Sequence, residues 1–140
     1  MTNKKYKIGY TTGVFDMFHI GHLNILKRAK EQCEYLIVGV TTDELCFTRK
    51  NKHPIINENE RMEIVGAIKY VDRVVPQRDM DKLLAVKEYG CDVVFVGSDW
   101  KGTPSWNEYE KQFNTLGCDV VYLDHTDGIS STILREKLKK

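Results

Sequence analysis

Short apolar runs alternate with helical patterns along the whole chain. Five apolar runs predict strands, and they lie at residues 6–10, 35–40, 71–75, 91–97 and 119–123. Apolar side chains at helical spacing predict helices at residues 23–29, 57–69, 83–89, 106–116 and 132–138. Alternating strands and helices are typical of parallel sheets. The chain is therefore predicted to be one α/β domain over residues 1–140, with a mostly parallel five-stranded sheet.

The segment after the second predicted strand is polar and is predicted to be an irregular loop. It runs from Thr41 to Asn59 and has Arg49-Lys50-Asn51-Lys52-His53-Pro54 at its centre. Such a charge cluster is usually a solvated turn. Here it follows the carboxyl end of a strand, where open parallel sheets bind ligands. Loops at other strand ends carry His19, Asp99 and Thr126, and this convergence predicts a site.

The loop after the first strand holds the richest chemistry. It contains Gly13, Asp16, His19 and His22, and it leads directly into a helical pattern. Unpaired backbone N–H groups and the helix dipole make such a helix start favourable for a phosphate. The two imidazoles add side-chain donors at the same end. A zinc site is disfavoured because no third ligand stands nearby at ligand spacing, while two ordinary core or surface histidines remain an alternative.

Composition excludes several classes of protein. The chain has 21 Lys and Arg against 20 Asp and Glu, and its formal net charge is +1. A general nucleic-acid or membrane-surface binder normally carries a basic excess. No apolar run reaches the roughly eighteen residues of a membrane span, and the polar start does not fit a secretory signal. The four cysteines are scattered without C-x-x-C pairing, so we expect free thiols in a reducing cytoplasm.

Two motifs at opposite ends of the chain carry a family resemblance. His19-Ile20-Gly21-His22 matches the HxGH signature of the nucleotidyltransferase superfamily, and Gly128-Ile129-Ser130-Ser131-Thr132 resembles the GIS[ST][ST] motif of cytidylyltransferases. Intermediate stretches also resemble that family, at Thr42-Asp43-Glu44-Leu45, Arg61, Tyr70-Val71-Asp72 and Val96-Gly97-Ser98-Asp99-Trp100. The similarity spans about Ile8 to Leu138 and is greatest to the bacterial glycerol-phosphate cytidylyltransferases. The catalytic domain of choline-phosphate cytidylyltransferases is also similar.

This resemblance implies a Rossmann-like, doubly wound fold, a homodimer, and CMP transfer from CTP with Mg²⁺ to a small phosphomonoester. It implies catalytic roles for His19, His22 and Lys50, with Lys52 as the alternative lysine. Arg61 would position the loop or the phosphates, and Asp16 would hold the loop or bind Mg²⁺, with the loop role favoured. The implied CTP site comprises Gly13, Val14, Phe15, Asp16, His19, Gly21, His22, Lys52, Arg61, Gly97, Asp99, Trp100, His125, Thr126, Gly128, Ile129, Ser130, Ser131 and Thr132. The implied acceptor site comprises Asp43, Lys50, Lys69 and Lys82.

Three positions depart from the family pattern. His125 and Lys69 stand where the family usually has arginine, and Val14 stands where the glycerol-phosphate enzymes have threonine. Lysine lacks the bidentate geometry of arginine, and histidine is only partly charged near neutrality. These departures concern the second substrate more than the nucleotidyl transfer.

The expected activity is CMP transfer to glycerol 3-phosphate, giving CDP-glycerol for cell-wall polymers such as teichoic acid or for capsule. Glycerol 2-phosphate and phosphocholine are alternative acceptors, and adenylyl transfer from ATP is a rival reaction. A non-catalytic nucleotide-binding module is a further alternative. A redox dinucleotide binder is excluded because no G-x-G-x-x-G follows the first strand.

Overall fold

The computed structural model describes residues 4–79, 81–124 and 131–138. Its centre is a sheet of five strands in the order β3-β2-β1-β4-β5. The strands are β1 (Tyr6–Gly13), β2 (Cys33–Thr41), β3 (Arg73–Gln77), β4 (Val93–Gly97) and β5 (Asp119–Leu123). Every pairing is parallel, so the predicted mostly parallel five-stranded sheet is confirmed and is wholly parallel.

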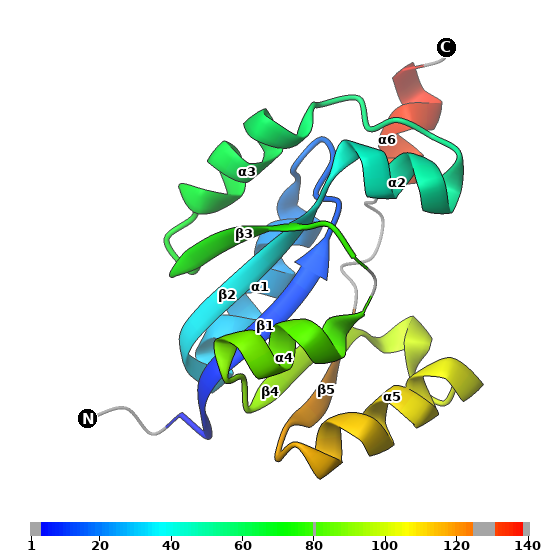
Figure 1. Ribbon diagram of the computed structural model, residues 1–140. Helices are drawn as coiled ribbons and strands as arrows, with labels where there is room; N and C mark the ends of the chain where they lie inside the picture. Colours follow the sequence, from blue (N-terminus) through cyan, green and yellow to red (C-terminus); the bar gives the residue numbers. More distant parts are fainter. Residues whose placement is uncertain (1–3, 80, 125–130, 139–140) are drawn as a thin grey trace.

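Helices cover both faces of this sheet (Figure 1). The helices are α1 (Ile20–Gln32), α2 (Asp43–Lys50), α3 (Glu58–Gly66), α4 (Lys82–Tyr89), α5 (Pro104–Thr115) and α6 (Ser131–Leu138), with a 3₁₀ turn, η1 (Ser98–Trp100). One core cluster joins α1 and α3 to the sheet, and a second joins α4 and α5 to it. This is the Rossmann-like, doubly wound arrangement that the sequence predicts.

The strand order reverses direction between β1 and β4. The chain moves from β1 outward through β2 to β3, and then crosses to β4 and continues to β5. In such sheets ligands bind at the carboxyl ends of the strands, in the crevice at this reversal. The loop that follows β1 and the η1 turn that follows β4 both lie at this edge of the sheet.

The segment predicted to be an irregular loop contains a helix, so that prediction is wrong in part. The hydroxyl of Thr42 accepts a hydrogen bond from the N–H of Leu45 and caps α2, and Asp43 and Glu44 in the first turn suit the helix dipole. Asn51 ends the helix with a left-handed backbone, φ 53°. The helix lacks a clear apolar stripe because its surface is largely exposed, which is why its spacing did not predict it.

Two predicted boundaries also change. The helix expected to continue to residue 69 ends at Gly66. The third strand, expected to end before Pro76, continues through it to Gln77. Proline lacks a donor and is tolerated because β3 is an edge strand that pairs only with β2.

The four cysteines are free and buried, as predicted. Cys33, Cys91 and Cys118 lie in the core, where burial raises the pKa of their thiols to about 11, 12 and 12. Within the described ranges, every helix is too short or too polar to cross a lipid bilayer.

Candidate active site

The loop between β1 and α1 is held in a strained backbone conformation. Phe15 and Met17 have φ angles of 56° and 49°, in the left-handed region that non-glycine residues rarely adopt. The ring of Phe15 is buried and lies against Gly13, where an added Cβ would stand 3.0 Å from the ring. Strained non-glycine residues cost on the order of 1–3 kcal/mol each and cluster at functional sites. The strain here lies immediately before the two histidines.

His19 and His22 cap the start of α1 reciprocally. Nδ1 of His19 accepts a hydrogen bond from the N–H of Gly21 at 3.0 Å, and Nδ1 of His22 accepts one from the N–H of His19 at 3.3 Å. The two rings stack with centroids 3.8 Å apart. The sequence predicts phosphate contacts for these histidines but not this capping role, which Ser, Thr, Asp or Asn usually fills.

The caps determine which nitrogen carries the proton. A neutral imidazole that accepts at Nδ1 must carry its proton at Nε2. Burial lowers the pKa of both histidines, and for His22 burial and the nearby His19 together lower it to about 4. Both rings are therefore neutral at pH 7 and present N–H donors at Nε2. Nε2 of His19 is buried and has no hydrogen-bond partner within the described ranges, and a phosphate oxygen would satisfy it.

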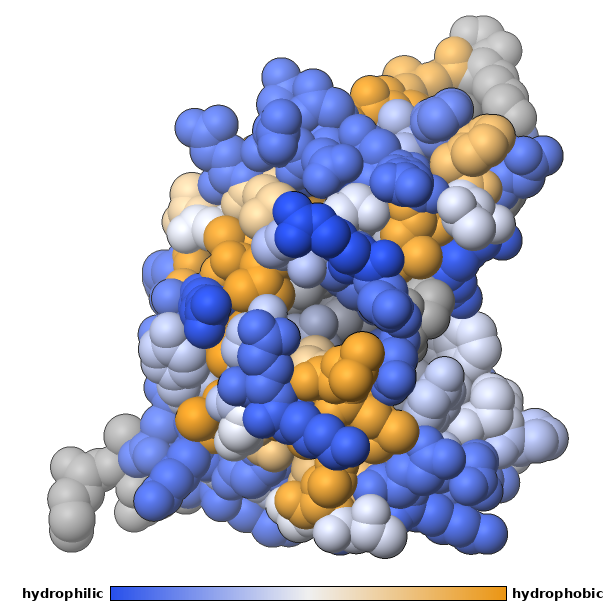
Figure 2. All heavy atoms as spheres, viewed as in Figure 1, coloured by the Kyte–Doolittle hydropathy of each residue, from blue (hydrophilic) through white to orange (hydrophobic). Residues whose placement is uncertain are grey.

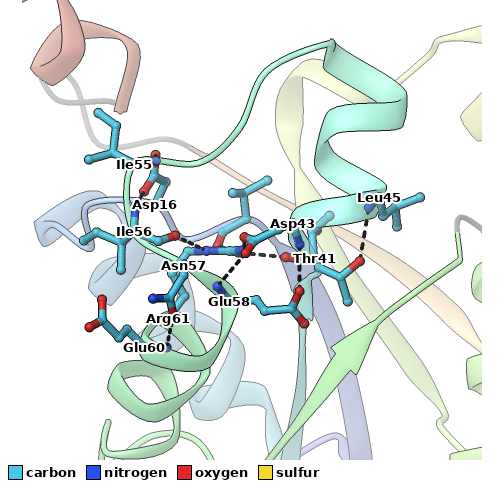
Figure 3. A network of polar contacts seen from close by, with 12 residues as sticks. Asp16, Thr41, Asp43, Leu45, Ile55, Ile56, Asn57, Glu58, Glu60 and Arg61 are labelled. Atoms are coloured by element: carbon cyan, nitrogen blue, oxygen red, sulfur yellow. Dashed lines mark hydrogen bonds and ion pairs between the residues drawn. The ribbon is translucent and has the colours of Figure 1, made fainter.

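Asp16 ties the histidine loop to the segment after α2. Its side chain is 2% exposed, and its two carboxylate oxygens accept hydrogen bonds from the N–H groups of Ile55 and Ile56, both at 2.9 Å. Figure 3 shows this contact beside the start of α3. These bonds agree with the loop-holding role that the sequence favours for Asp16, because both oxygens already bind the protein.

Arg61 makes a second tie at the same place (Figure 3). Its guanidinium donates to the carbonyl oxygens of Ile56, Val14 and Thr41 at 2.7–2.8 Å, and to the carboxylate of Asp43 at 2.5 Å. The side chain is 1% exposed. Of the two roles that the sequence leaves open for Arg61, this geometry fits positioning of the loop. It also places Asp43, predicted for the acceptor, in a structural ion pair.

These ties bring the predicted lysine segment to the histidine loop. Lys50 ends α2, and the structure does not describe its side chain. Lys52 is exposed and precedes the two anchored isoleucines. The ring of His53 stacks on Phe47 of α2 at 4.5 Å. The segment is therefore anchored at both ends, by α2 and by Asp16.

The other predicted site residues fall into three groups. Gly97, Asp99 and Trp100 lie at the end of β4 and in η1, across the strand reversal from the histidines, and Asp99 and Trp100 are exposed. His125, Thr126, Gly128, Ile129 and Ser130 lie outside the described residues. Ser131 and Thr132 open α6, and their side chains are not described.

Two of the lysines predicted for the acceptor site, Lys82 and Lys69, lie far apart in the fold. Lys82 is the first residue of α4, at the same edge of the sheet as the histidine loop. Burial, together with the charge of Arg49, lowers its pKa to about 8. Lys69 lies beyond the end of α3, just before the amino end of β3, so within one chain it is at the opposite end of the parallel strands from the histidine loop. The sequence did not indicate Arg49 beyond its place in a basic run.

Metal binding by side chains finds little support. No group of three His, Cys, Asp or Glu side chains in the described ranges is arranged to hold a metal ion. The carboxylate of Asp16 is already committed to two backbone N–H groups.

Comparison with known proteins identifies the family of the chain. Residues 10–137 match the family model described as cytidylyltransferase-like. Glycerol-3-phosphate cytidylyltransferase of Bacillus subtilis is 35% identical over 91% of this chain and 94% of its own length. An FAD synthase of Thermoplasma volcanium is 34% identical over 91% of this chain and 90% of its own.

A solved structure shows the same fold. It is a lipopolysaccharide core biosynthesis protein of Thermoplasma volcanium, with a TM-score of 0.72 and 30% identity, covering 86% of this chain and 97% of its own. The chain shares both the fold and nearly the full length of these relatives. It belongs to the cytidylyltransferase-like family and is a nucleotidyltransferase.

Proposed function

We propose that this chain transfers CMP from CTP to a small phosphorylated alcohol, with glycerol 3-phosphate as the preferred acceptor, and releases pyrophosphate. The observation that carries the proposal is the buried Nε2 of His19 at the start of α1, which has no partner among the residues that the structure describes. A donor in that position costs free energy until an acceptor meets it. The triphosphate of a nucleotide supplies such an oxygen, and the helix dipole favours its charge.

The reaction needs no nucleophile from the protein. A phosphate oxygen of the acceptor attacks the α-phosphorus of CTP, the bond from that phosphorus to the bridging oxygen breaks, and pyrophosphate leaves with the electron pair. Negative charge rises on the oxygens around the phosphorus, so the protein stabilises charge and orients the two substrates. His19 and His22 would donate from Nε2 to those oxygens. Their lowered pKa values keep them as neutral donors whose geometry the caps hold.

Mg²⁺ would reach this site with the nucleotide. The ion usually binds few protein carboxylates and is carried by substrate phosphates. When bound, it neutralises phosphate charge. Lys52 or Lys50 would add positive charge from the anchored segment, and the start of α6 would hold the nucleotide from the other side.

Two features support an anionic acceptor without a quaternary ammonium group. Lys82 places a half-buried ammonium at the carboxyl edge. Of the aromatic side chains that could contact a choline-type group, Trp106 is already engaged in packing, because it is 5% exposed and its ring lies 5.3 Å from that of Tyr109. Trp100 is 44% exposed. A glycerol phosphate requires no aromatic cage.

The second candidate is adenylyl transfer from ATP. The FAD synthase relatives favour it, because FAD contains an adenylyl group and one of them is as similar to this chain over its length as the cytidylyltransferase is. The C-terminal Gly128-Ile129-Ser130-Ser131-Thr132 motif and Tyr70-Val71-Asp72 resemble cytidylyltransferases and favour CTP. We also infer a homodimer from the family resemblance, which light scattering of the purified protein tests.

Pyrophosphate release tests the function. The protein is supplied with CTP or ATP, Mg²⁺, and one acceptor from glycerol 3-phosphate, glycerol 2-phosphate and phosphocholine. The proposal expects release with CTP and glycerol 3-phosphate at least tenfold faster than with any other pair. Faster release with ATP supports the second candidate. CTP binding without release for any acceptor supports the non-catalytic alternative.

A further inference from the structure

The indole of Trp106 is locked into the second core cluster. Trp106 is the third residue of α5. Its backbone N–H donates to the hydroxyl of Thr103, which caps this helix, at 3.4 Å. Its ring is 5% exposed and lies 5.3 Å from Tyr109 and 6.4 Å from Phe113, between ring centroids. This row of rings along α5 leaves the indole little freedom to move. A group that rests on it is therefore placed at a defined point.

That group is the ammonium of Lys82. Its Nζ lies 5.5 Å from the centroid of the Trp106 ring. Tryptophan is the best aromatic partner for a cation, because the face of its ring carries partial negative charge. The contact joins the start of α4 to the start of α5. Both helices begin after strands, at the carboxyl edge of the sheet, where the histidine loop between β1 and α1 also lies.

The ammonium has no acidic partner among the described residues. The ion pairs in these ranges are Lys30 with Asp72 and Arg61 with Asp43. The guanidinium of Arg49, which is also positive, adds to the effect of burial in lowering the pKa of Lys82. A half-buried cation without an acidic partner is unfavourable until an anion binds near it. The Lys82 ammonium is thus complementary to a phosphate.

We propose that Trp106 is a positioning residue for the acceptor, whose indole holds the Lys82 ammonium at the place where the acceptor phosphate binds. This inference rests on the proposed function, which assigns Lys82 to the acceptor. It adds that one ring face, rather than a carboxylate, sets the position of that cation. The ring leaves the positive charge of Lys82 unneutralised, whereas a carboxylate would compete with the acceptor phosphate.

A double-mutant cycle separates positioning from simple core packing. The four proteins are wild type, Trp106→Leu, Lys82→Met and the double variant, with KM for CTP and for glycerol 3-phosphate measured in each. Trp106→Leu is expected to raise the acceptor KM about tenfold and to change the CTP KM less than twofold. In the Lys82→Met background the same substitution should change the acceptor KM less than twofold. Trp106→Phe keeps a ring and should recover most of the loss.

Phe113→Leu is the matched structural control. Phe113 is fully buried in the same row of rings, and its aromatic contacts are with Trp106 and Tyr109. It should lower the unfolding temperature without a selective rise in acceptor KM. Equal effects of Trp106→Leu with and without Lys82, or a parallel rise in both KM values, would overturn the inference.

Failure of the proposed function gives a different result. Wild-type protein then releases no pyrophosphate from CTP with any acceptor. The same four proteins are then titrated with glycerol 3-phosphate in a calorimeter. Binding that weakens in Trp106→Leu only when Lys82 is present still supports the inference. Binding that is absent, or independent of both residues, refutes it.

Discussion

His19 and His22 cap each other across the first turn of α1, so the residues expected to contact phosphate also build the helix start that holds it. Each Nδ1 accepts a backbone N–H, and the rings stack at 3.8 Å. The arrangement places the proton of each ring on Nε2, and Nε2 of His19 has no partner among the described residues. Nδ1 therefore stabilises the helix start, whereas Nε2 is the atom expected to contact the phosphate. Substitutions can separate the structural role from the catalytic role.

His19→Asn should separate them. The oxygen of asparagine can accept the Gly21 N–H in place of Nδ1, because Asn is a good capping residue, but no group replaces Nε2. The free energy of unfolding should stay within about 0.5 kcal/mol of wild type, while turnover falls about 10²–10³-fold, as for loss of one transition-state donor. His19→Ala should lose the same activity and also about 1 kcal/mol of stability. Denaturant unfolding and pyrophosphate release measure the two quantities, and near-normal turnover in His19→Asn would contradict the role.

Asp16→Asn should loosen the segment after α2. Its side-chain NH₂ cannot accept, so one of the N–H groups of Ile55 and Ile56 loses its partner. An unsatisfied buried donor costs about 1–3 kcal/mol. Trypsin should then cut faster at Arg49, Lys50 or Lys52. Asp79→Asn is the control, because its exposed carboxylate accepts only a local N–H, that of Asp81. Equal cleavage of both variants would argue against the tie.

Arg61→Lys should destabilise the protein although the charge is kept. Lysine cannot reach the four oxygens that the guanidinium joins across three segments. We expect a loss of about 2–4 kcal/mol in the free energy of unfolding, from buried acceptors left unpaired. Arg28→Lys is the matched control, since its guanidinium makes an exposed bond to the carbonyl of Asp124. It should change stability by less than about 0.5 kcal/mol.

Stability should fall with acid because of His22. Its folded pKa is about 4, below the ordinary value of 6.5, because it is buried beside His19. Between these values the unfolded state binds more protons than the folded state, so stability is complete above pH 6.5 and declines toward pH 4. Urea unfolding at pH 7, 6 and 5 should show this decline. His22→Asn should reduce the slope, and an unchanged slope would contradict the burial of a neutral ring.

The affinity for the acceptor should weaken in mild alkali. Burial and the charge of Arg49 hold the pKa of Lys82 at about 8 in the free protein, well below 10.5. Its positive charge is therefore lost as pH rises through 8, while a phosphomonoester is already a dianion there. The acceptor KM should rise between pH 8 and 9.5 in the wild type. Lys82→Arg should remove this rise, because arginine stays charged.

The sequence predicted the fold well because the strands bury apolar runs on both faces. The motif around His19 and His22 was placed correctly between a strand and a helix for the same reason. The short α2 escaped detection because it buries little, and its start is defined by the Thr42 cap rather than by an apolar stripe. A local pattern of apolar residues reports which side chains are buried, and α2 buries few of them.

The roles of Asp16 and Arg61 depend on contacts that no local pattern contains. Their partners lie 39 to 47 residues away for the Asp16–Ile55 and Arg61–Val14 bonds. The family resemblance likewise assigned Lys69 to the acceptor site. Within one chain, the parallel topology places Lys69 near the amino ends of the strands, away from the histidine loop at their carboxyl ends. Only the fold decides which polar residues meet.

A crystal structure of the protein with CTP would show whether His19 contacts the nucleotide. We expect the triphosphate at the start of α1, with Nε2 of His19 within about 3.2 Å of a phosphate oxygen. A triphosphate bound elsewhere, or an Nε2 of His19 that faces away from it, would show that His19 does not stabilise the reacting phosphate.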